Sequence, residues 1–238
     1  MKANIDKRRL ESLTLLSSKL GVEFKELEGL HQALTHTSYA NEGKHAALSH
    51  NERLEFLGDA VLDLIVSQYL FVNFPNLPEG ELTKARAAIV CEPSLARVAT
   101  QLGIGEFLLL GKGEISTGGR ERTSILADAF EAIIGAIYLD AGFECASQFI
   151  VKFFAEQLQS VKRGDYVKDF KTLLQEAVQK NTESKVIYEV VSESGPDHNK
   201  TFEITVKING AILGSGVGKS KKEAEQNAAQ QALSQMKV

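Results

Sequence analysis

Residues 50–64 read His50-Asn-Glu-Arg-Leu-Glu-Phe-Leu-Gly-Asp-Ala-Val-Leu-Asp-Leu64, and their spacing fits one helix with two different faces. One face is apolar and comprises Leu54, Leu57, Val61, Leu64 and Ile65. The other face carries four carboxylates and no Lys or Arg, and it comprises Glu52, Glu55, Asp59 and Asp63. Like charges at helical spacing repel one another, so a bound cation would stabilise this face. Carboxylate ligands favour magnesium, calcium or manganese over zinc, and the alternative is an acidic face in water.

A second acidic pattern follows at residues 124–140. Asp128 and Glu131 are three residues apart and therefore share one helix face, while Phe130 and other apolar residues occupy the opposite face. The acidic face also holds Ala132 and Gly135, whose small size allows another helix to approach closely. If that partner is the helix of residues 50–64, four carboxylates converge on one small volume, which only cations make tolerable. Two unrelated acidic faces in water are the alternative.

The composition is that of an ordinary water-soluble protein. The chain has 238 residues, of which 43% are hydrophobic and 24% charged, enough for one core and a small second domain. Cys91 and Cys145 lie far apart and outside any C-x-x-C pattern, which predicts neither a disulfide framework nor a cysteine metal site. Residues 1–10 are polar and charged, and no apolar run reaches membrane-spanning length. We expect a cytoplasmic protein with no membrane partner.

The net charge of −4 at first argues against a nucleic-acid partner, but the charge is unevenly spread. Residues 166–238 contain ten lysines against nine acidic residues, so the acidic excess lies in the first two-thirds of the chain, where the carboxylates are. Local clusters of lysine matter more than net charge for phosphate binding. The lysines near residue 220 therefore keep a nucleic-acid partner open.

Helical spacing dominates the first two-thirds of the chain. Apolar periodicity predicts helices over 10–20 and 27–34, a break at 35–39, a loop at 41–49, and the acidic helix to about Asn73. Further helices are expected from 79, from Pro93 and from Ser124, with a flexible polar segment over 111–120. Nothing here alternates with period two. We therefore expect an all-α domain over residues 1–160 and a polar linker over 161–166.

The last third has a different pattern. Residues 170–179 are helical in spacing, residues 186–190 and 202–208 alternate with period two, and 211–217 is a return strand after the hairpin turn Asn209-Gly210. Residues 220–236 form an alanine-rich helix. The order predicts a small α+β domain of the form α-β-β-β-α over residues 167–238, with both helices on one face of the sheet.

Two other kinds of site are excluded by spacing. Gly218-Lys-Ser220 ends like a phosphate-binding P-loop, but that motif needs a glycine at 213, where Leu213 stands, and a parallel α/β sheet. We therefore expect no nucleotide cofactor. The histidines His31, His36, His45 and His50 have no metal-ligand spacing, so core or surface positions are expected for them.

The acidic segments resemble those of a known family. Asn51-Glu-Arg-Leu-Glu-Phe-Leu-Gly-Asp-Ala60 is similar to the signature segment of the ribonuclease III family, and Ser124-Ile-Leu-Ala-Asp-Ala-Phe-Glu-Ala132 resembles its second acidic motif. The resemblance implies an all-helical nuclease domain whose metal-binding acids are Glu55, Asp59, Asp128 and Glu131. It gives Glu52 and Glu79 supporting roles, and it makes Phe56 an aromatic that packs into the partner of a homodimer.

The chemistry implied is hydrolysis by water. These helices offer no nucleophile–base pair, and carboxylate-bound Mg²⁺ lowers the pKa of water and stabilises charge on a phosphate. The family implies Mg²⁺ as cofactor, with Mn²⁺ able to substitute, and cleavage to 5′-phosphate and 3′-hydroxyl ends. Among the ligands, Asp59 and Glu131 are expected to be the most directly catalytic. A homodimer with one site for each strand would leave short 3′ overhangs.

The C-terminal segment resembles a double-stranded RNA-binding domain. The resemblance rests on Lys219-Ser-Lys-Lys-Glu-Ala224 at a helix start and on Gly195-Pro-Asp-His198 before the second strand. It implies that Lys219, Lys221 and Lys222 contact phosphates, together with the positive end of the helix dipole. It further implies that three residues reach the minor groove and its 2′-hydroxyls, namely Gln175, Glu176 and His198.

Two classes of function remain open. The first is a metal-dependent endoribonuclease that cleaves double-stranded RNA, with precursors of ribosomal RNA, structured messenger RNAs and transfer RNA precursors as expected substrates. The second is a regulator that binds duplex RNA without cleaving it. A pure binding protein would gain nothing from four mutually repelling carboxylates, so the sequence favours the endoribonuclease.

Overall fold

The computed structural model describes residues 5–42, 49–163, 170–179, 185–196 and 200–236. The chain divides into two compact units, residues 1–166 and 167–238, and each is described by itself. The predicted architecture, an all-α unit followed by an α-β-β-β-α unit, is confirmed. Among the described residues, no helix is both long enough and apolar enough to cross a membrane.

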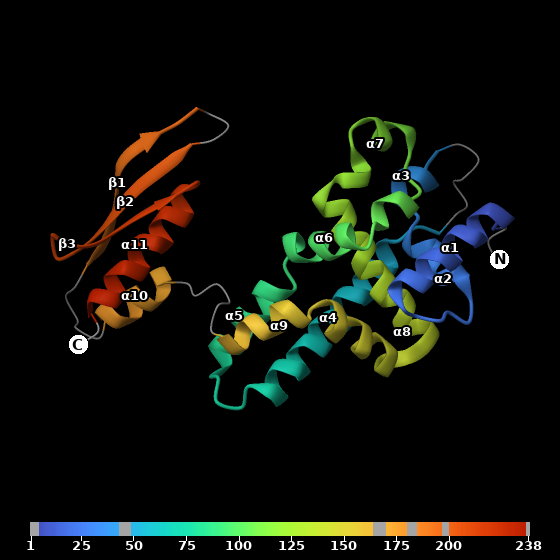
Figure 1. Cartoon of the computed structure of the whole chain (residues 1–238), viewed down its shortest axis with the longest axis horizontal. Helices are drawn as coiled ribbons and strands as arrows, with labels where there is room; N and C mark the ends of the chain where they lie inside the picture. Colours follow the sequence, from blue (N-terminus) through green and yellow to red (C-terminus); the bar gives the residue numbers. More distant parts are fainter. Residues whose placement is uncertain (1–4, 43–48, 164–169, 180–184, 197–199, 237–238) are drawn as a thin grey trace. The chain divides into compact units, whose positions relative to one another are not determined.

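The first unit is helical throughout (Figure 1). Its helices are α1 (Lys7–Leu20), α2 (Leu27–Ala33), α3 (Thr37–Ala40), α4 (Glu52–Asn73), α5 (Glu79–Ile89), α6 (Glu92–Gln101), α7 (Lys112–Ser116), α8 (Thr123–Phe153) and α9 (Ala155–Arg163). Two short 3₁₀ segments lie in the connections: η2 (Ile104–Phe107) between α6 and α7, and η3 (Gly119–Glu121) between α7 and α8. The acidic helix and the second acidic helix are thus α4 and α8.

Helices α4 and α8 cross at two glycines. A Cβ atom added at Gly58 would overlap the carbonyl oxygen of Glu131, and one added at Gly135 would overlap the carbonyl oxygen of Leu54. The two backbones therefore touch directly, which no side chain larger than hydrogen permits. The close approach expected for the small face of residues 132–135 is confirmed, and its partner is the acidic helix.

The core of this unit surrounds the middle of α8. Phe130 is fully buried and packs against Phe149 and Phe154, with ring centroids 5.7 and 6.0 Å apart. Helix α8 bends at Gly142, whose φ of +83° interrupts the helical backbone, so its second half turns back along the core. Residues 125–137, the first part of α8, are buried on nearly all sides, which explains why this stretch is apolar apart from Asp128 and Glu131.

The structure adds detail to three local expectations. The break predicted at 35–39 contains most of the short helix α3, which begins at Thr37 and has His36 as its N-cap. The segment 111–120, expected to be flexible and polar, holds α7 and η3, and Arg122 binds Glu114 and the Thr117 hydroxyl within it. The expected linker is helical up to Arg163, where Val161 is buried, and residues 164–166 lie outside the described part.

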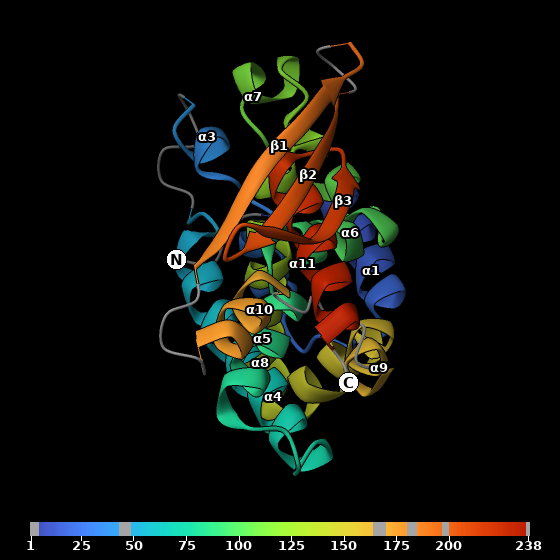
Figure 2. The same cartoon turned by 90° about the vertical axis from the view of Figure 1, so that its left-hand side faces the viewer.

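The second unit is an antiparallel sheet covered on one face by two helices. Strands β1 (Val186–Ser194), β2 (Thr201–Ile208) and β3 (Ala211–Gly218) pair in the order β1-β2-β3. Helices α10 (Phe170–Gln179) and α11 (Lys221–Met236) lie side by side against that sheet (Figures 1 and 2). The hairpin turn is as predicted, with φ of +52° at Asn209 and +86° at Gly210.

The glycines of β3 have a packing role. A Cβ atom at Gly214, Gly216 or Gly218 would overlap backbone atoms of α11. The alternation of the strand points these three positions at the helix, where buried alanines such as Ala228 meet them. The glycine-rich sequence that resembles a P-loop is therefore a site of close helix–sheet contact.

The crossing of α4 and α8 predicts a large cost for one added methyl group. We expect Gly58→Ala to lower the free energy of unfolding by at least about 3 kcal/mol, because the new Cβ overlaps backbone that cannot move independently. Gly80→Ala is the matched control, since a Cβ atom there meets nothing within 4 Å. Urea unfolding followed by circular dichroism measures both; equal stabilities of the two variants would contradict the crossing.

Candidate active site

Three carboxylates from the two crossed helices form one group. Oxygen atoms of Glu55 on α4 and of Asp128 and Glu131 on α8 all lie within 4.8 Å of one another. Gly58 lies one turn from Glu55 and touches the backbone of Glu131, so the helix contact itself brings these acids together. The structure thus joins the two acidic segments at one point, as the sequence predicted.

Asp59 lies at the edge of this group. Its side chain is exposed, and its carboxylate is not among the three that lie within 4.8 Å. It is nevertheless close enough for its charge to raise the pKa of both Glu131 and Glu55. Of the four predicted ligands, three are therefore clustered and the fourth stands close by on an exposed position.

The acids of the cluster resist ionisation. Burial raises the pKa of the Glu131 carboxyl to about 8, and the charges of Asp59 and Glu55 contribute to this rise. Burial likewise raises the pKa of Glu55, and the charge of Asp128 is the next largest cause of this rise. No described lysine or arginine is among the groups that shift these pKa values. A cation placed among these oxygens would reverse the shifts, since it favours the ionised carboxylates.

The predicted supporting acids lie outside the three-carboxylate group. The Oε2 atom of Glu52 lies 3.7 Å from Nδ1 of His50, and the charge of Glu52 contributes to the raised pKa of Glu55. Glu79 is exposed at the start of α5 and accepts a hydrogen bond from the Thr83 hydroxyl at 2.9 Å. The structure therefore gives Glu52 a direct electrostatic link to the cluster, whereas the hydrogen bond of Glu79 lies within its own helix.

Two features of the site were missed from the sequence. No Lys or Arg shares the acidic face of α4, but Arg86 of α5 lies 4.0 Å from the Asp63 carboxylate. Burial is the main cause of the raised pKa of Asp128. The charge of Glu92 at the start of α6 adds to this rise, and His36 opposes it. Neither Glu92 nor His36 has a spacing that relates it to α8, so only the packing of α6 and α3 reveals them.

The cluster has the size of a divalent-metal site. Mg²⁺ and Ca²⁺ bind carboxylate oxygens at about 2.0–2.6 Å, so two ligands of one ion lie within about 5 Å of each other. The three oxygens satisfy this limit. Half-buried acids with raised pKa values and only oxygen donors fit a hard divalent cation rather than zinc.

The exposed face of α4 is strongly apolar. Phe56 is 80% exposed although it lies next to Glu55, and Phe71 and Val72 further along the helix are 72% and 66% exposed. A cavity of about 370 Å³ opens beside Leu64 and Phe71 between α4 and α5. Exposing apolar side chains of this size to water is unfavourable.

The second unit presents its predicted lysines on the surface. Lys219, Lys221 and Lys222 are exposed at the start of α11, and the Lys221 ammonium lies 5.6 Å from the Phe202 ring centroid. Two backbone donors at this helix start are bound by side chains: the Lys219 N–H donates to the Glu223 carboxylate at 2.7 Å, and the Glu223 N–H donates to the Ser220 hydroxyl at 3.2 Å.

The other predicted RNA contacts are placed only in part. Gln175 is half-buried on α10. The side chain of Glu176 and all of His198 lie outside the described part of the structure. The lysines are therefore the predicted RNA-binding residues for which the structure gives an accessible position.

Comparison with known proteins identifies both units. The family model described as Ribonuclease-III-like matches residues 26–158, and the double-stranded RNA binding motif matches residues 170–236. The chain belongs to the ribonuclease III family. It is 54% identical over 226 residues to Ribonuclease 3 of Caldanaerobacter subterraneus, covering 95% of this chain and 99% of that protein. Ribonuclease 3 of a Geobacillus species is 52% identical over 237 residues, covering 100% and 96%.

A solved structure supports the same family. The nuclease domain of ribonuclease III from Campylobacter jejuni superposes with a TM-score of 0.56 at 48% identity, covering 60% of this chain and 95% of that one. A ribonuclease III nuclease domain joined to a double-stranded RNA-binding domain makes this chain an endoribonuclease for double-stranded RNA. The family and the enzyme class predicted from the sequence are confirmed.

The raised pKa of Glu131 makes stability depend on pH in a defined direction. The group has a pKa of about 8 in the folded protein against 4.5 as its ordinary value. The stabilisation by its proton is complete below pH 4.5 and is lost as the pH rises towards 8. Without metal, Glu131→Gln should therefore melt above the parent at pH 8.5, and the difference should shrink towards pH 5.

Differential scanning fluorimetry with chelator at the two pH values measures this shift. Glu144→Gln, which changes an exposed acid on the same helix, is the control and should show no such pH dependence. Added Mg²⁺ should reverse the order by stabilising the parent more than the variant. A difference between Glu131→Gln and parent that is the same at both pH values would contradict the buried, crowded carboxyl.

Proposed function

We propose that the Glu55, Asp128 and Glu131 carboxylates, with Asp59 at their edge, bind Mg²⁺ and cleave double-stranded RNA by hydrolysis. The observation that carries this proposal is the group of three oxygens within 4.8 Å, built from two segments far apart in the sequence. Three clustered carboxylates with a fourth at their edge repel one another when ionised, and a cation among them would relieve that repulsion. Mn²⁺, which takes the same oxygen ligands, would substitute.

The residues of the cluster have separate tasks in this reaction. Bound Mg²⁺ would supply a water of lowered pKa and a counter-charge for the phosphate. Glu55 and Asp128 would hold the ion, while Asp59 and Glu131, the predicted catalytic acids, would also act on the attacking water. Glu52 acts on Glu55 through charge. Hydrolysis that breaks the bond to the 3′-oxygen gives 5′-phosphate and 3′-hydroxyl ends.

A cleavage assay with labelled duplex RNA tests this function. The parent should cut the duplex with Mg²⁺ and not with EDTA, and Glu131→Gln should cut at least about a hundredfold more slowly because a metal ligand is lost. Glu144→Gln is the control and should cut at the parental rate. Cutting in EDTA, or binding of the duplex without cutting by the parent, would refute the proposal; the latter result would leave a non-cleaving RNA-binding regulator.

The lysines at the start of α11 are proposed to hold the RNA backbone. Lys219, Lys221 and Lys222 are exposed and adjacent, and phosphate contacts of this kind make binding depend on salt. Gln175, Glu176 and His198 would complete the contact at the minor groove, where the 2′-hydroxyls distinguish RNA from DNA.

Replacing Lys221 and Lys222 by alanine should weaken duplex binding and reduce the salt slope by about one per lysine. Lys200 and Lys207 provide the matched double variant, since they are ion-paired with Glu193 and Glu189 on the sheet. Filter binding over a range of salt concentrations measures both slopes. If the two double variants have the same slope, the α11 lysines are not the phosphate contacts.

The apolar face of α4 is proposed to pair two copies of the chain, with Phe56 as the anchor. The nuclease domain from Campylobacter jejuni has a structurally flexible region that is involved in dimer formation, and Phe56 of this chain is 80% exposed. Two copies would present one site to each strand and leave short 3′ overhangs. Such a dimer acting in the cytoplasm would suit precursors of ribosomal and transfer RNA and structured messenger RNAs.

Phe56→Ala should shift the protein towards monomer in sedimentation velocity, since truncating a buried aromatic anchor costs about 2 kcal/mol or more. Leu15→Ala, a change at a 55% exposed position on α1, should leave the sedimentation unchanged. A dimer of undiminished stability in the Phe56 variant would remove Phe56 from the interface.

A further inference from the structure

His36 is held by backbone hydrogen bonds near the start of α4, within electrostatic reach of Asp128. Its backbone N–H donates to the Leu109 carbonyl at 3.0 Å, and the preceding residue, Thr35, accepts a hydrogen bond from the Asn51 N–H at 2.9 Å. Asn51 directly precedes α4, so the segment of His36 is tied to the helix that carries Glu55. Thr35 is fully buried, and the segment therefore has little freedom to move.

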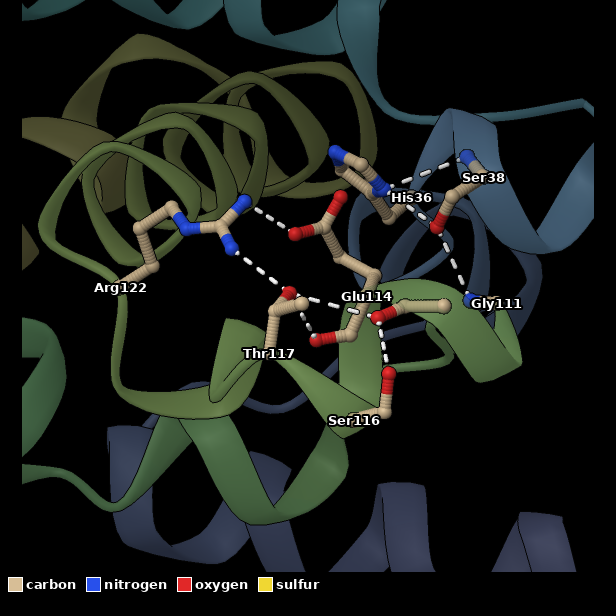
Figure 3. A network of polar contacts seen from close by, with 8 residues as sticks. His36, Ser38, Gly111, Glu114, Ser116, Thr117 and Arg122 are labelled. Carbon is tan, nitrogen blue, oxygen red and sulfur yellow. Dashed lines mark hydrogen bonds and ion pairs between the residues drawn. The ribbon is translucent and has the colours of Figure 1, made fainter.

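A chain of hydrogen bonds fixes the proton of the His36 ring (Figure 3). The Gly111 N–H donates to the Ser38 hydroxyl at 2.9 Å, and that hydroxyl lies 2.8 Å from His36 Nδ1. The Ser38 backbone N–H also donates to Nδ1, at 3.2 Å. A backbone N–H cannot accept, so Nδ1 must be the unprotonated acceptor and the proton of the neutral ring lies on Nε2.

The protonated Nε2 edge of the ring is left for a partner outside the protein. A charge on His36 lowers the pKa of Asp128, so the ring is within electrostatic reach of that carboxyl. Figure 3 also draws Glu114, whose carboxylate is bound by Arg122 at the start of α8. Among the described residues, none accepts a hydrogen bond from His36 Nε2. The site thus contains a donor of fixed orientation that is still available to a ligand.

We propose that His36 is a catalytic residue whose Nε2–H donates a hydrogen bond to a phosphate oxygen of the RNA at the acid cluster. The proposal rests on the nuclease function proposed above. The cluster presents only acids on α4 and α8, which repel a phosphate, and a neutral N–H donor can approach the RNA without competing with the cation for the carboxylates. A donor whose orientation is set before the RNA binds stabilises developing charge with little reorganisation.

A pair of substitutions separates this role from a purely structural one. In His36→Asn the side-chain oxygen can stand where Nδ1 stands and accept from the Ser38 N–H, which keeps the N-cap of α3 but removes the outer donor. In His36→Gln the side-chain amide reaches the place of Nε2. A structural role predicts that Asn is the better replacement, and the proposed role predicts that Gln is.

We expect His36→Asn to keep the parental melting temperature and to lower kcat by about ten- to a hundredfold, with duplex binding in chelator changed less than about threefold. His36→Gln should recover part of that kcat. The proposal is overturned if His36→Asn cleaves at the parental rate, or if Gln is no better than Asn. Failure of the parent itself to cleave would instead refute the proposed function.

Nuclear magnetic resonance tests the geometry without reference to activity. In the full chain with ¹⁵N-labelled histidine, the signal of His36 is assigned from its absence in the Asn variant among the five histidines. We expect the Nε2–H tautomer in the free protein and a shift of Nε2 when duplex RNA and Mg²⁺ are added to the slowly cutting Glu131→Gln protein. A proton on Nδ1, or a His36 signal that duplex RNA leaves unchanged, would overturn the proposal.

Discussion

The site depends on direct backbone contact between α4 and α8. Gly58 and Gly135 are the two positions at which a Cβ atom would overlap the facing helix, and Glu55 and Glu131 stand beside them. The same contact that packs the core therefore fixes the distance between the acids. Because packed helices cannot slide freely past backbone contacts, the three carboxylate oxygens are held within 4.8 Å before any ligand arrives.

That arrangement carries an electrostatic cost that explains the chemistry. Burial and mutual repulsion raise the pKa of Glu131 to about 8, so the metal-free site retains protons near neutral pH. A divalent cation would replace those protons and turn the repulsion into attraction. Crowding of the acids lowers the stability of the metal-free fold, and binding of the ion would restore that stability. The same two helices can therefore form both the core and the reactive site.

The sequence predicted the features that follow from local residue patterns, but it did not predict which side chains come into contact through tertiary packing. The acidic faces of α4 and α8, the small residues between them and the Asn209-Gly210 hairpin were all predicted, because each follows from local periodicity or turn chemistry. His36, Glu92 and Arg86 were not connected to the acids, since their proximity arises from tertiary packing. The helices within 111–121 are accompanied by contacts of Arg122 with Glu114 and Thr117, and no local sequence pattern predicts these contacts.

The most direct test of the shared metal site is the anomalous diffraction of crystals grown with Mn²⁺. We predict a strong anomalous peak within about 2.5 Å of carboxylate oxygens from both α4 and α8, including those of Glu55, Asp128 and Glu131. Ordered carboxylates at this crossing with no peak between them, or manganese bound only elsewhere on the chain, would contradict a metal site built by the two helices.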